Sequence, residues 1–241
     1  MNNGKFEYNK IDTIVFDLDG TLLNTLDDLT AAVNHALGAF GYAPFDLARV
    51  RRYVGNGVPK LIDRALYFAQ TGREPDMEHG EFVDRSLARA CLAVFTEYYD
   101  KHNADMTKPY DGIAEMLSEV TACGIKSAIV TNKYDGAAQT LKAEFFGSVN
   151  VVVGAREGIR PKPATDGVYK ALEELRSDKT RAVYVGDGET DIATAKNCGM
   201  PVVAVAWGFR DREELAKLGP DFIIDHPREL VKTLRAAGYI E

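Results

Sequence analysis

Short apolar runs recur along the chain and constrain its fold more than any other feature. They are rich in β-branched and aromatic residues and lie at 12–17, 125–131, 149–153, 181–186 and 201–205, with a weaker one at 222–225. Such runs are typical of strands buried on both faces of a sheet. Helical patterns separate them at 111–122, 135–146, 164–176, 189–198 and 211–218. Strands that alternate with helices predict an α/β fold with a Rossmann-like parallel sheet and helices on both of its faces.

The segment from 24 to 103 breaks this alternation. It contains helical periodicity, as in the run from 58 to 71, and no convincing strand. We interpret it as an all-helical domain inserted after the first strand, which leaves 1–23 and 104–241 as the two parts of the core. A chain of 241 residues is long for one simple domain and short for two full ones, so a core with a smaller insert fits the length.

Charge and hydropathy exclude two classes of partner. The net charge of −7 argues against nucleic acid, which would require a basic face. The chain has no run of ~18 apolar residues, so no membrane span is predicted. Its polar start, MNNGKFEYNKID, also lacks the apolar core of a secretory signal.

The cysteines and histidines predict neither disulfides nor a zinc site. Cys91, Cys123 and Cys198 are odd in number and form no CxxC pair. The histidines lack metal-ligand spacing and are interpreted as surface or packing residues; they are His35, His79, His102 and His226. A reducing cytoplasm is therefore the expected compartment.

Polar side chains follow the predicted strands where each one ends. The first strand ends in Asp17-Leu18-Asp19-Gly20, the second in Thr131-Asn132, and the fourth in Gly186-Asp187-Gly188, while a loop after the third carries Lys162. Open parallel sheets bind their ligands at this edge. The sequence therefore predicts a polar site there.

The carboxylates of this edge require a positive charge. Residues i and i+2 of an extended chain point the same way, so Asp17 and Asp19 share a side, roughly 7 Å apart. Together with Asp187 and Asp191 they would repel one another unless a cation lay between them, and Mg²⁺ prefers oxygen ligands of this kind. Each piece alone is common in turns and helix caps, but the four together in this order are hard to explain as turns.

Four segments resemble the conserved motifs of the haloacid dehalogenase superfamily, in order and in spacing. They are FDLDGTL, VTN, PKP and VGDGETD, and the helical insert resembles the cap domain of the superfamily's first structural class. Within the superfamily, DGTLLNTLDDLTAAVNHAL and RRYVGNGVPKLIDRAL resemble phosphoglycolate phosphatases. The resemblance implies a Mg²⁺-dependent phosphomonoester hydrolase that forms an aspartyl-phosphate.

The resemblance also implies a role for each core residue. Asp17 is the expected nucleophile, Asp19 the acid and base, Thr131 a ligand of the phosphoryl oxygens, and Lys162 a neutralising charge. The expected Mg²⁺ ligands are the Asp17 carboxylate, the Asp19 backbone carbonyl and Asp187, with Asp191 supporting Lys162 or a metal-bound water.

Two positions depart from the family pattern. Asn24 stands where many relatives have Asp, at the first cap hinge, and Gly188 stands where Ser is frequent. Neither change removes an expected ligand or catalytic group, so they bear on the hinge and on the surroundings of the metal site.

Substrate contacts are expected from the second motif and from the cap. The candidates are Asn132, Gly57, Lys60 and Arg64. Gly55-Asn56-Gly57 also resembles the start of a dinucleotide fingerprint, but it follows no buried strand and the third glycine position holds Lys60. Trp207 and Arg210 are the alternative specificity residues on the core.

The chemistry of relatives narrows the reaction and leaves the substrate open. Asp19 favours phosphoryl transfer over dehalogenation, and Leu29 occupies the position where mutases of this class place a cap histidine. Phosphonate hydrolases use a cap lysine, for which Lys60 lies too far along the chain. Phosphoglycolate is the first choice, while pyrophosphate, nucleoside monophosphates and sugar phosphates remain open. So do a non-enzymatic phospho-aspartate switch and the choice between monomer and homodimer.

Overall fold

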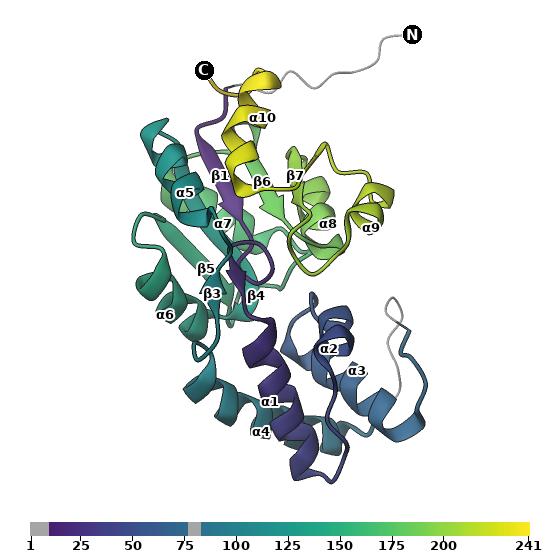
Figure 1. The fold of residues 1–241 in the computed structure, drawn as a ribbon. Helices are drawn as coiled ribbons and strands as arrows, with labels where there is room; N and C mark the ends of the chain where they lie inside the picture. The colour runs from purple at the N-terminus through teal and green to yellow at the C-terminus, as the bar shows by residue number, and fades with distance from the viewer. Residues whose placement is uncertain (1–9, 77–82) are drawn as a thin grey trace.

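The computed structural model describes residues 10–76 and 83–241, and its centre is one six-stranded parallel sheet (Figure 1). The strand order is β5-β4-β1-β6-β7-β8. The strands are β1 (Thr13–Phe16), β4 (Lys126–Tyr134), β5 (Val151–Ala155), β6 (Ala182–Gly186), β7 (Val202–Val205) and β8 (Phe222–Ile224). The predicted α/β class and all six predicted strands are confirmed.

Helices cover both faces of the sheet because successive side chains of a strand point to opposite sides. Ile14 and Phe16 belong to one apolar cluster and Val15 to the other. The first cluster includes side chains of α5 (Ile113–Ala122), α6 (Asp135–Phe145) and α10 (Leu230–Ala236). The second includes those of α7 (Asp166–Leu175), α8 (Glu189–Cys198) and α9 (Arg212–Lys217).

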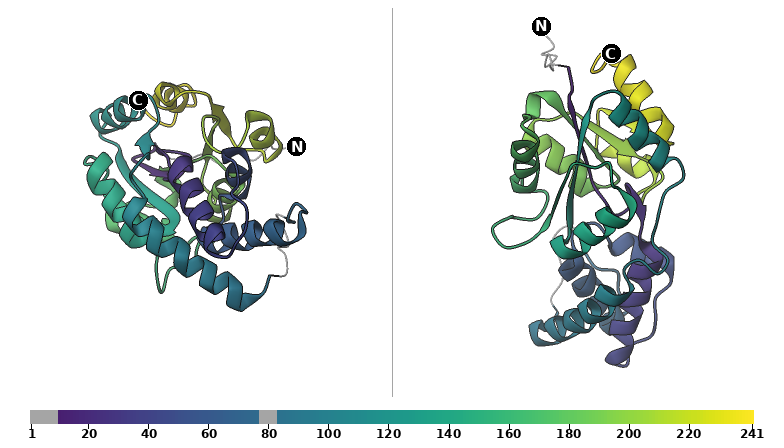
Figure 2. Two further views of the ribbon diagram at one scale, coloured as in Figure 1. Left: turned by 60° about the horizontal axis from the view of Figure 1, so that its bottom comes forward. Right: turned by 90° about the vertical axis from the view of Figure 1, so that its left-hand side faces the viewer.

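Four further helices form a group beyond the carboxyl ends of the strands (Figures 1 and 2). They are α1 (Leu26–Ala39), α2 (Leu47–Tyr53), α3 (Val58–Thr71) and α4 (Arg85–His102). These helices share an apolar cluster of their own, to which the core contributes Phe209. No helix among the described residues is long and apolar enough to cross a membrane.

The two segments that connect this helical group to the sheet are joined to each other. They pair as antiparallel β2 (Leu23–Asn24) and β3 (Lys108–Pro109). Nearby, the buried Asp28 carboxylate accepts hydrogen bonds from the backbone N–H of Met106 at 3.0 Å and Thr107 at 2.8 Å. The returning connection is thus held by a side chain in the first turn of α1.

The sequence missed the shortest elements and misplaced one strand end. Strands of two residues, such as β2 and β3, are too short for a periodic pattern, and α2, α10 and the 3₁₀ turns at Lys179–Arg181 and Pro227–Glu229 were not predicted. The strand predicted to end at 131 continues to Tyr134, because β4 changes register between Val130 and Tyr134 and then pairs again. Of the predicted surface histidines, His79 lies outside the described residues.

Candidate active site

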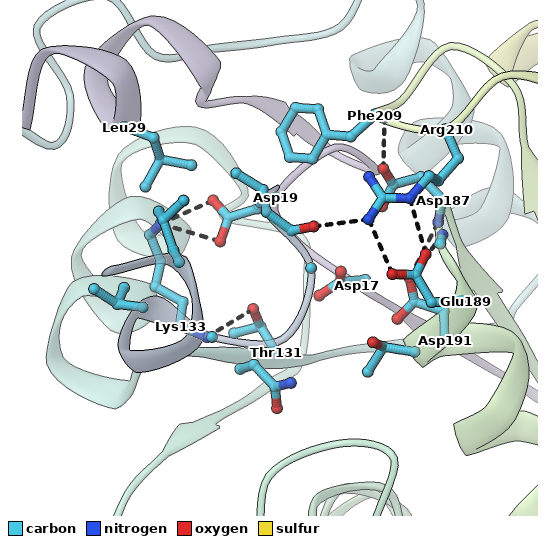
Figure 3. Close-up of a pocket in the computed structure, with 18 residues that line it drawn as sticks. Asp17, Asp19, Leu29, Thr131, Lys133, Asp187, Glu189, Asp191, Phe209 and Arg210 are labelled. Carbon is cyan, nitrogen blue, oxygen red and sulfur yellow. Dashed lines mark hydrogen bonds and ion pairs between the residues drawn. The ribbon is translucent and has the colours of Figure 1, made fainter. Parts of the chain in front are cut away.

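A small chamber lies at the carboxyl ends of β1, β4 and β6, between the sheet and the four-helix group (Figure 3). It encloses about 60 Å³. Core residues on its wall include Asp17, Asp19, Thr131, Asn132, Lys133, Asp187, Glu189, Asp191, Phe209 and Arg210. The helical group contributes Leu29, Val54, Gly55, Gly57, Val58 and Leu61. Most of the residues predicted for the site therefore line one cavity.

Lys162 links the end of β1 to the segment that follows β6. Its ammonium lies 2.8 Å from Asp17 Oδ1 and 2.7 Å from Asp191 Oδ1, and its side chain is only 4% exposed. The hydroxyl of Tyr184, in the middle of β6, lies 3.1 Å from the same nitrogen. Asp191 accepts two more hydrogen bonds, both 3.2 Å long, from the backbone N–H groups of Asp187 and Gly188. Both oxygens of Asp191 are thus engaged, whereas Asp17 Oδ1 is buried without a hydrogen bond of good geometry.

Asp187 is held in a tight backbone cradle. One of its oxygens accepts from the N–H of Phe209 at 2.7 Å, and the other from the hydroxyl of Thr21 at 3.3 Å. Gly20 has φ +85°, and a Cβ there would lie 2.3 Å from Asp187 Oδ2. A Cβ on Gly208 would lie 2.3 Å from Asp187 Cβ. Only glycine fits at these two positions, so the turn after β1 and the loop after β7 fix this carboxylate.

Asp17, Asp187 and Asp191 form the acidic group of the site. Within the described ranges, one oxygen of each lies within 4.8 Å of the others, an arrangement that could hold a metal ion. Burial, the nearby Asp191 charge and, in the opposite sense, Lys162 together raise the pKa of Asp17 to about 7. Burial and the charges of Asp191 and Asp17 raise the pKa of Asp187 well above its ordinary value. A bound divalent cation would relieve this repulsion.

Asp19 is paired with a lysine that the sequence did not single out. The buried Lys133 ammonium lies 2.8 Å and 3.1 Å from the two Asp19 oxygens (Figure 3). The same nitrogen lies 2.8 Å from the hydroxyl of Tyr99, which belongs to α4. Burial opposes the charge on Lys133, but Asp19 and Tyr99 hold the pKa of Lys133 above its ordinary value. A charged residue directly after VTN was the only sequence signal for this contact.

Thr131 and Asn132 lie in the irregular part of β4 and have different surroundings. The Thr131 hydroxyl lines the chamber and accepts from the N–H of Lys133 at 3.2 Å. Asn132 also lines the chamber, but its amide binds the backbone of Lys162, accepting from N–H at 2.7 Å and donating to C=O at 3.1 Å. Asn132 thus positions the loop that carries Lys162.

The three cap candidates are placed in different ways. Gly57 lines the chamber, while Lys60 is exposed and is not among the residues that line it. Arg64 is 6% exposed and points into the helical group. Its guanidinium donates to Tyr53 O and to Asn56 Oδ1, both at 2.7 Å. This arrangement gives Arg64 the role of shaping the loop at 53–57.

Arg64→Met is expected to lower the free energy of unfolding by about 1–3 kcal/mol, because a buried carbonyl and amide would lose a charged donor. Lys60→Met, an exposed change on the same helix, should stay within about 0.5 kcal/mol of wild type. Urea unfolding of both variants measures the difference. Equal effects would contradict a structural role for Arg64.

Arg210 connects the same loop to the core. It forms two 2.9 Å hydrogen bonds to the Glu189 carboxylate and donates to Val54 O at 2.8 Å. Asn56 adds a 2.9 Å hydrogen bond to the hydroxyl of Thr190. Trp207, the other core alternative, is not among the residues that line the chamber and donates to Thr21 O at 3.0 Å. Arg210 is therefore the core alternative that borders the site.

Known proteins resemble the chain over almost its whole length. The model of the haloacid dehalogenase-like hydrolases matches residues 14–205. An N-acetylmuramic acid 6-phosphate phosphatase of Pseudomonas aeruginosa is 31% identical, over 95% of this chain and 96% of its own. A phosphoglycolate phosphatase of Mesorhizobium japonicum is 34% identical, over 94% and 98%. The crystal structure of a candidate phosphoglycolate phosphatase from Lactobacillus delbrueckii subsp. bulgaricus has a TM-score of 0.88 and 33% identity, and covers 93% of this chain and 98% of its own.

Proposed function

The chain belongs to the haloacid dehalogenase-like hydrolase family, and from that premise we propose that it is a Mg²⁺-dependent phosphomonoester hydrolase that acts through an aspartyl-phosphate. One observation carries the proposal. Lys162 Nζ lies 2.8 Å from Asp17 and 2.7 Å from Asp191, beside Asp187, so a nucleophile, a fixed positive charge and an acidic group meet at one sheet edge. This combination suits attack on a phosphate dianion.

The acidic group fits a magnesium ion. One oxygen each of Asp17, Asp187 and Asp191 lies within 4.8 Å of the others, and burial together with the charges of Asp191 and Asp17 raises the pKa of Asp187. Asp17 and Asp187 would hold the ion together with the backbone carbonyl of Asp19, while Asp191 remains engaged with Lys162. When bound, the ion neutralises charge on the phosphate and on the attacking carboxylate.

Side chains of the protein carry out the phosphoryl transfer and the hydrolysis that follows. A carboxylate oxygen of Asp17 attacks phosphorus, and the ester P–O bond breaks as Asp19 gives a proton to the leaving oxygen. Asp19 then takes a proton from the water that attacks the aspartyl-phosphate, which releases phosphate and restores Asp17. Lys162 balances the negative charge throughout, and the Thr131 hydroxyl faces the chamber where the phosphoryl oxygens would lie.

We assign residues 24–103 to a cap that closes over this chemistry. Support comes from the separate apolar cluster of α1–α4 and from the paired connections at β2 and β3. The Arg210 and Asn56 hydrogen bonds describe a closed arrangement, in which the loop at 53–57 covers the chamber. Opening would admit substrate and closing would exclude water.

Phosphoglycolate is the substrate we propose first. The chamber is small, about 60 Å³, and several relatives carry the name phosphoglycolate phosphatase. Leu29, 4% exposed, occupies the wall where a mutase would place a histidine, which favours hydrolysis over internal transfer. The cations on the chamber wall are Lys133 and Arg210, and each is paired with a carboxylate, Asp19 and Glu189 respectively.

Asp19→Asn is expected to lower kcat for phosphoglycolate by about 10²–10⁴-fold, because the alkoxide would leave without a proton. The loss should be smaller for p-nitrophenyl phosphate, whose phenolate barely requires protonation. Steady-state kinetics on both esters measures the contrast. Equal losses for the two esters would count against Asp19 as the acid.

The test of the proposed function is a panel of phosphomonoesters with Mg²⁺. We expect hydrolysis, with kcat/KM for phosphoglycolate above that for pyrophosphate and nucleoside monophosphates. The lifetime of phosphorylated Asp17 separates an enzyme from a switch. Rapid turnover supports the enzyme, whereas a half-life of hours with no hydrolysis of any ester would overturn the proposal.

A further inference from the structure

A second, larger cavity adjoins the chamber. It encloses about 230 Å³, against about 60 Å³ for the chamber, and lies between α4 of the helical group and the start of α6 on the core. We call it the annex. Its wall consists of Val58, Pro59, Leu92, Phe95, Thr96, Tyr99, Asp100, Asn132, Lys133, Tyr134, Ala137 and Ala155.

The annex and the chamber have a common wall. Val58, Asn132 and Lys133 line both cavities. Lys133 contacts Asp19 on the chamber side at 2.8 Å and Tyr99 of the annex wall at 2.8 Å. The contacts therefore run without a break from the proposed acid to the annex.

The geometry of the proposed reaction favours a leaving alcohol that lies near this wall. In an in-line displacement at phosphorus, the leaving oxygen departs on the side opposite the attacking oxygen. The acid must lie within hydrogen-bond reach of that oxygen. Since Asp19 is held against Lys133, a leaving oxygen within reach of Asp19 would lie beside the common wall, and the rest of the alcohol could extend toward the annex.

The residues that line the annex determine which kind of ligand it can bind. Carbon surface comes from Leu92, Phe95 and Ala137, and the exposed ring of Tyr134 adds an aromatic face. Among the lining residues Lys133 is the sole cation, and Asp19 neutralises it. Asp100 adds a carboxylate, so a second anionic group on the alcohol would meet net negative charge. Mostly apolar walls with a few polar groups are typical of sites for small organic ligands.

We propose that the annex binds the uncharged alcohol portion of a larger phosphomonoester, of the size of a sugar. The proposal rests on the proposed function and extends its substrate range from a two-carbon acid to sugar phosphates. It also places this selectivity mainly on α4 and α6, and none of it on the loop at 53–57.

The test fills the annex without touching the chamber. Leu92→Trp adds bulk from α4, and Leu87→Trp is the matched control, because Leu87 is also partly buried on α4 but does not line the annex. With Mg²⁺ and glucose 6-phosphate as probe, Leu92→Trp should lower kcat/KM at least tenfold, mainly through KM. Phosphoglycolate should change less than twofold, and Leu87→Trp should change neither substrate more than twofold. Ala137→Leu fills the annex from α6 and should reproduce the pattern if Leu92→Trp does not fold.

Three results would overturn the proposal. One is wild-type protein that hydrolyses phosphoglycolate but not glucose 6-phosphate. Another is an equal loss for both substrates in a folded annex-filling variant, and the third is no loss for either. Failure of the proposed function looks different, because folded wild-type protein would then hydrolyse no ester in the panel.

Discussion

Asp17→Asn is expected to lower kcat by on the order of 10⁴-fold or more, the largest effect of any single substitution in the chain. An amide cannot form the acyl phosphate, and it also removes one negative charge beside Lys162 and Asp187. The protein should therefore fold at least as well as wild type, since burial raises the pKa of Asp17 to about 7 and its charged form is unfavourable. Steady-state kinetics and thermal unfolding of the same preparation measure the two effects together.

Asp12→Asn is the matched control for this substitution. Asp12 lies at the other end of β1, where its partly buried carboxylate pairs with Arg181 and accepts from the hydroxyls of Thr13 and Ser177. Loss of these contacts should leave kcat within about twofold and lower the free energy of unfolding by about 0.5–1.5 kcal/mol. If Asp17→Asn retained more than a few per cent of wild-type activity, covalent catalysis at Asp17 would be excluded.

Chelation of magnesium is expected to abolish activity, and addition of Mg²⁺ to raise Tm by an amount that depends on pH. The carboxyl pKa of Asp17 is raised to about 7 from an ordinary value of 3.8, so the metal-free folded state binds more protons than the unfolded state between these pH values. Stability of the metal-free protein from this group therefore falls as pH rises through that window. Protons and Mg²⁺ compete for the same oxygens, so the gain from Mg²⁺ should be larger at pH 8 than at pH 5.

At 100 times its Kd, Mg²⁺ would add about 2.7 kcal/mol of stability. Asp187→Asn serves as the control: it should be more stable than wild type without metal and should lose the Mg²⁺-dependent rise in Tm. Ca²⁺ should inhibit, because a larger ion that takes more ligands would engage both oxygens of Asp17. Full activity in excess EDTA would exclude a metal held by Asp17 and Asp187.

The strands and their polar ends could be predicted because short local stretches of sequence determine both. An uninterrupted run such as 181–186 determines a buried strand, and the parallel arrangement then brings its end beside that of the first strand. The closeness of Asp17 and Asp191 follows from this topology, whereas Lys162 reaches both from a loop that Asn132 holds in place.

The contacts between the helical group and the core could not be predicted in this way. Lys133 reaches Tyr99, and Arg210 reaches Val54, across separations of 34 and 156 residues that no local pattern encodes. For Arg64, the local pattern suggested a contact that the structure does not contain. Its position on α3 suggested a residue that faces a ligand, but the helix turns it inward, where two acceptors of the preceding loop hold it.

The pairing of Leu23 with Pro109, and of Asn24 with Lys108, makes the points where the chain leaves and rejoins the sheet direct neighbours. A segment whose ends meet in this way can be exchanged for another of different length or shape while the sheet keeps its connectivity. In the function proposed above, the phosphoryl chemistry lies at the sheet edge, and the choice of alcohol lies in part on the helices between these paired strands. In evolutionary terms the two properties are separable, so relatives can share one reaction while they differ in the compounds they consume.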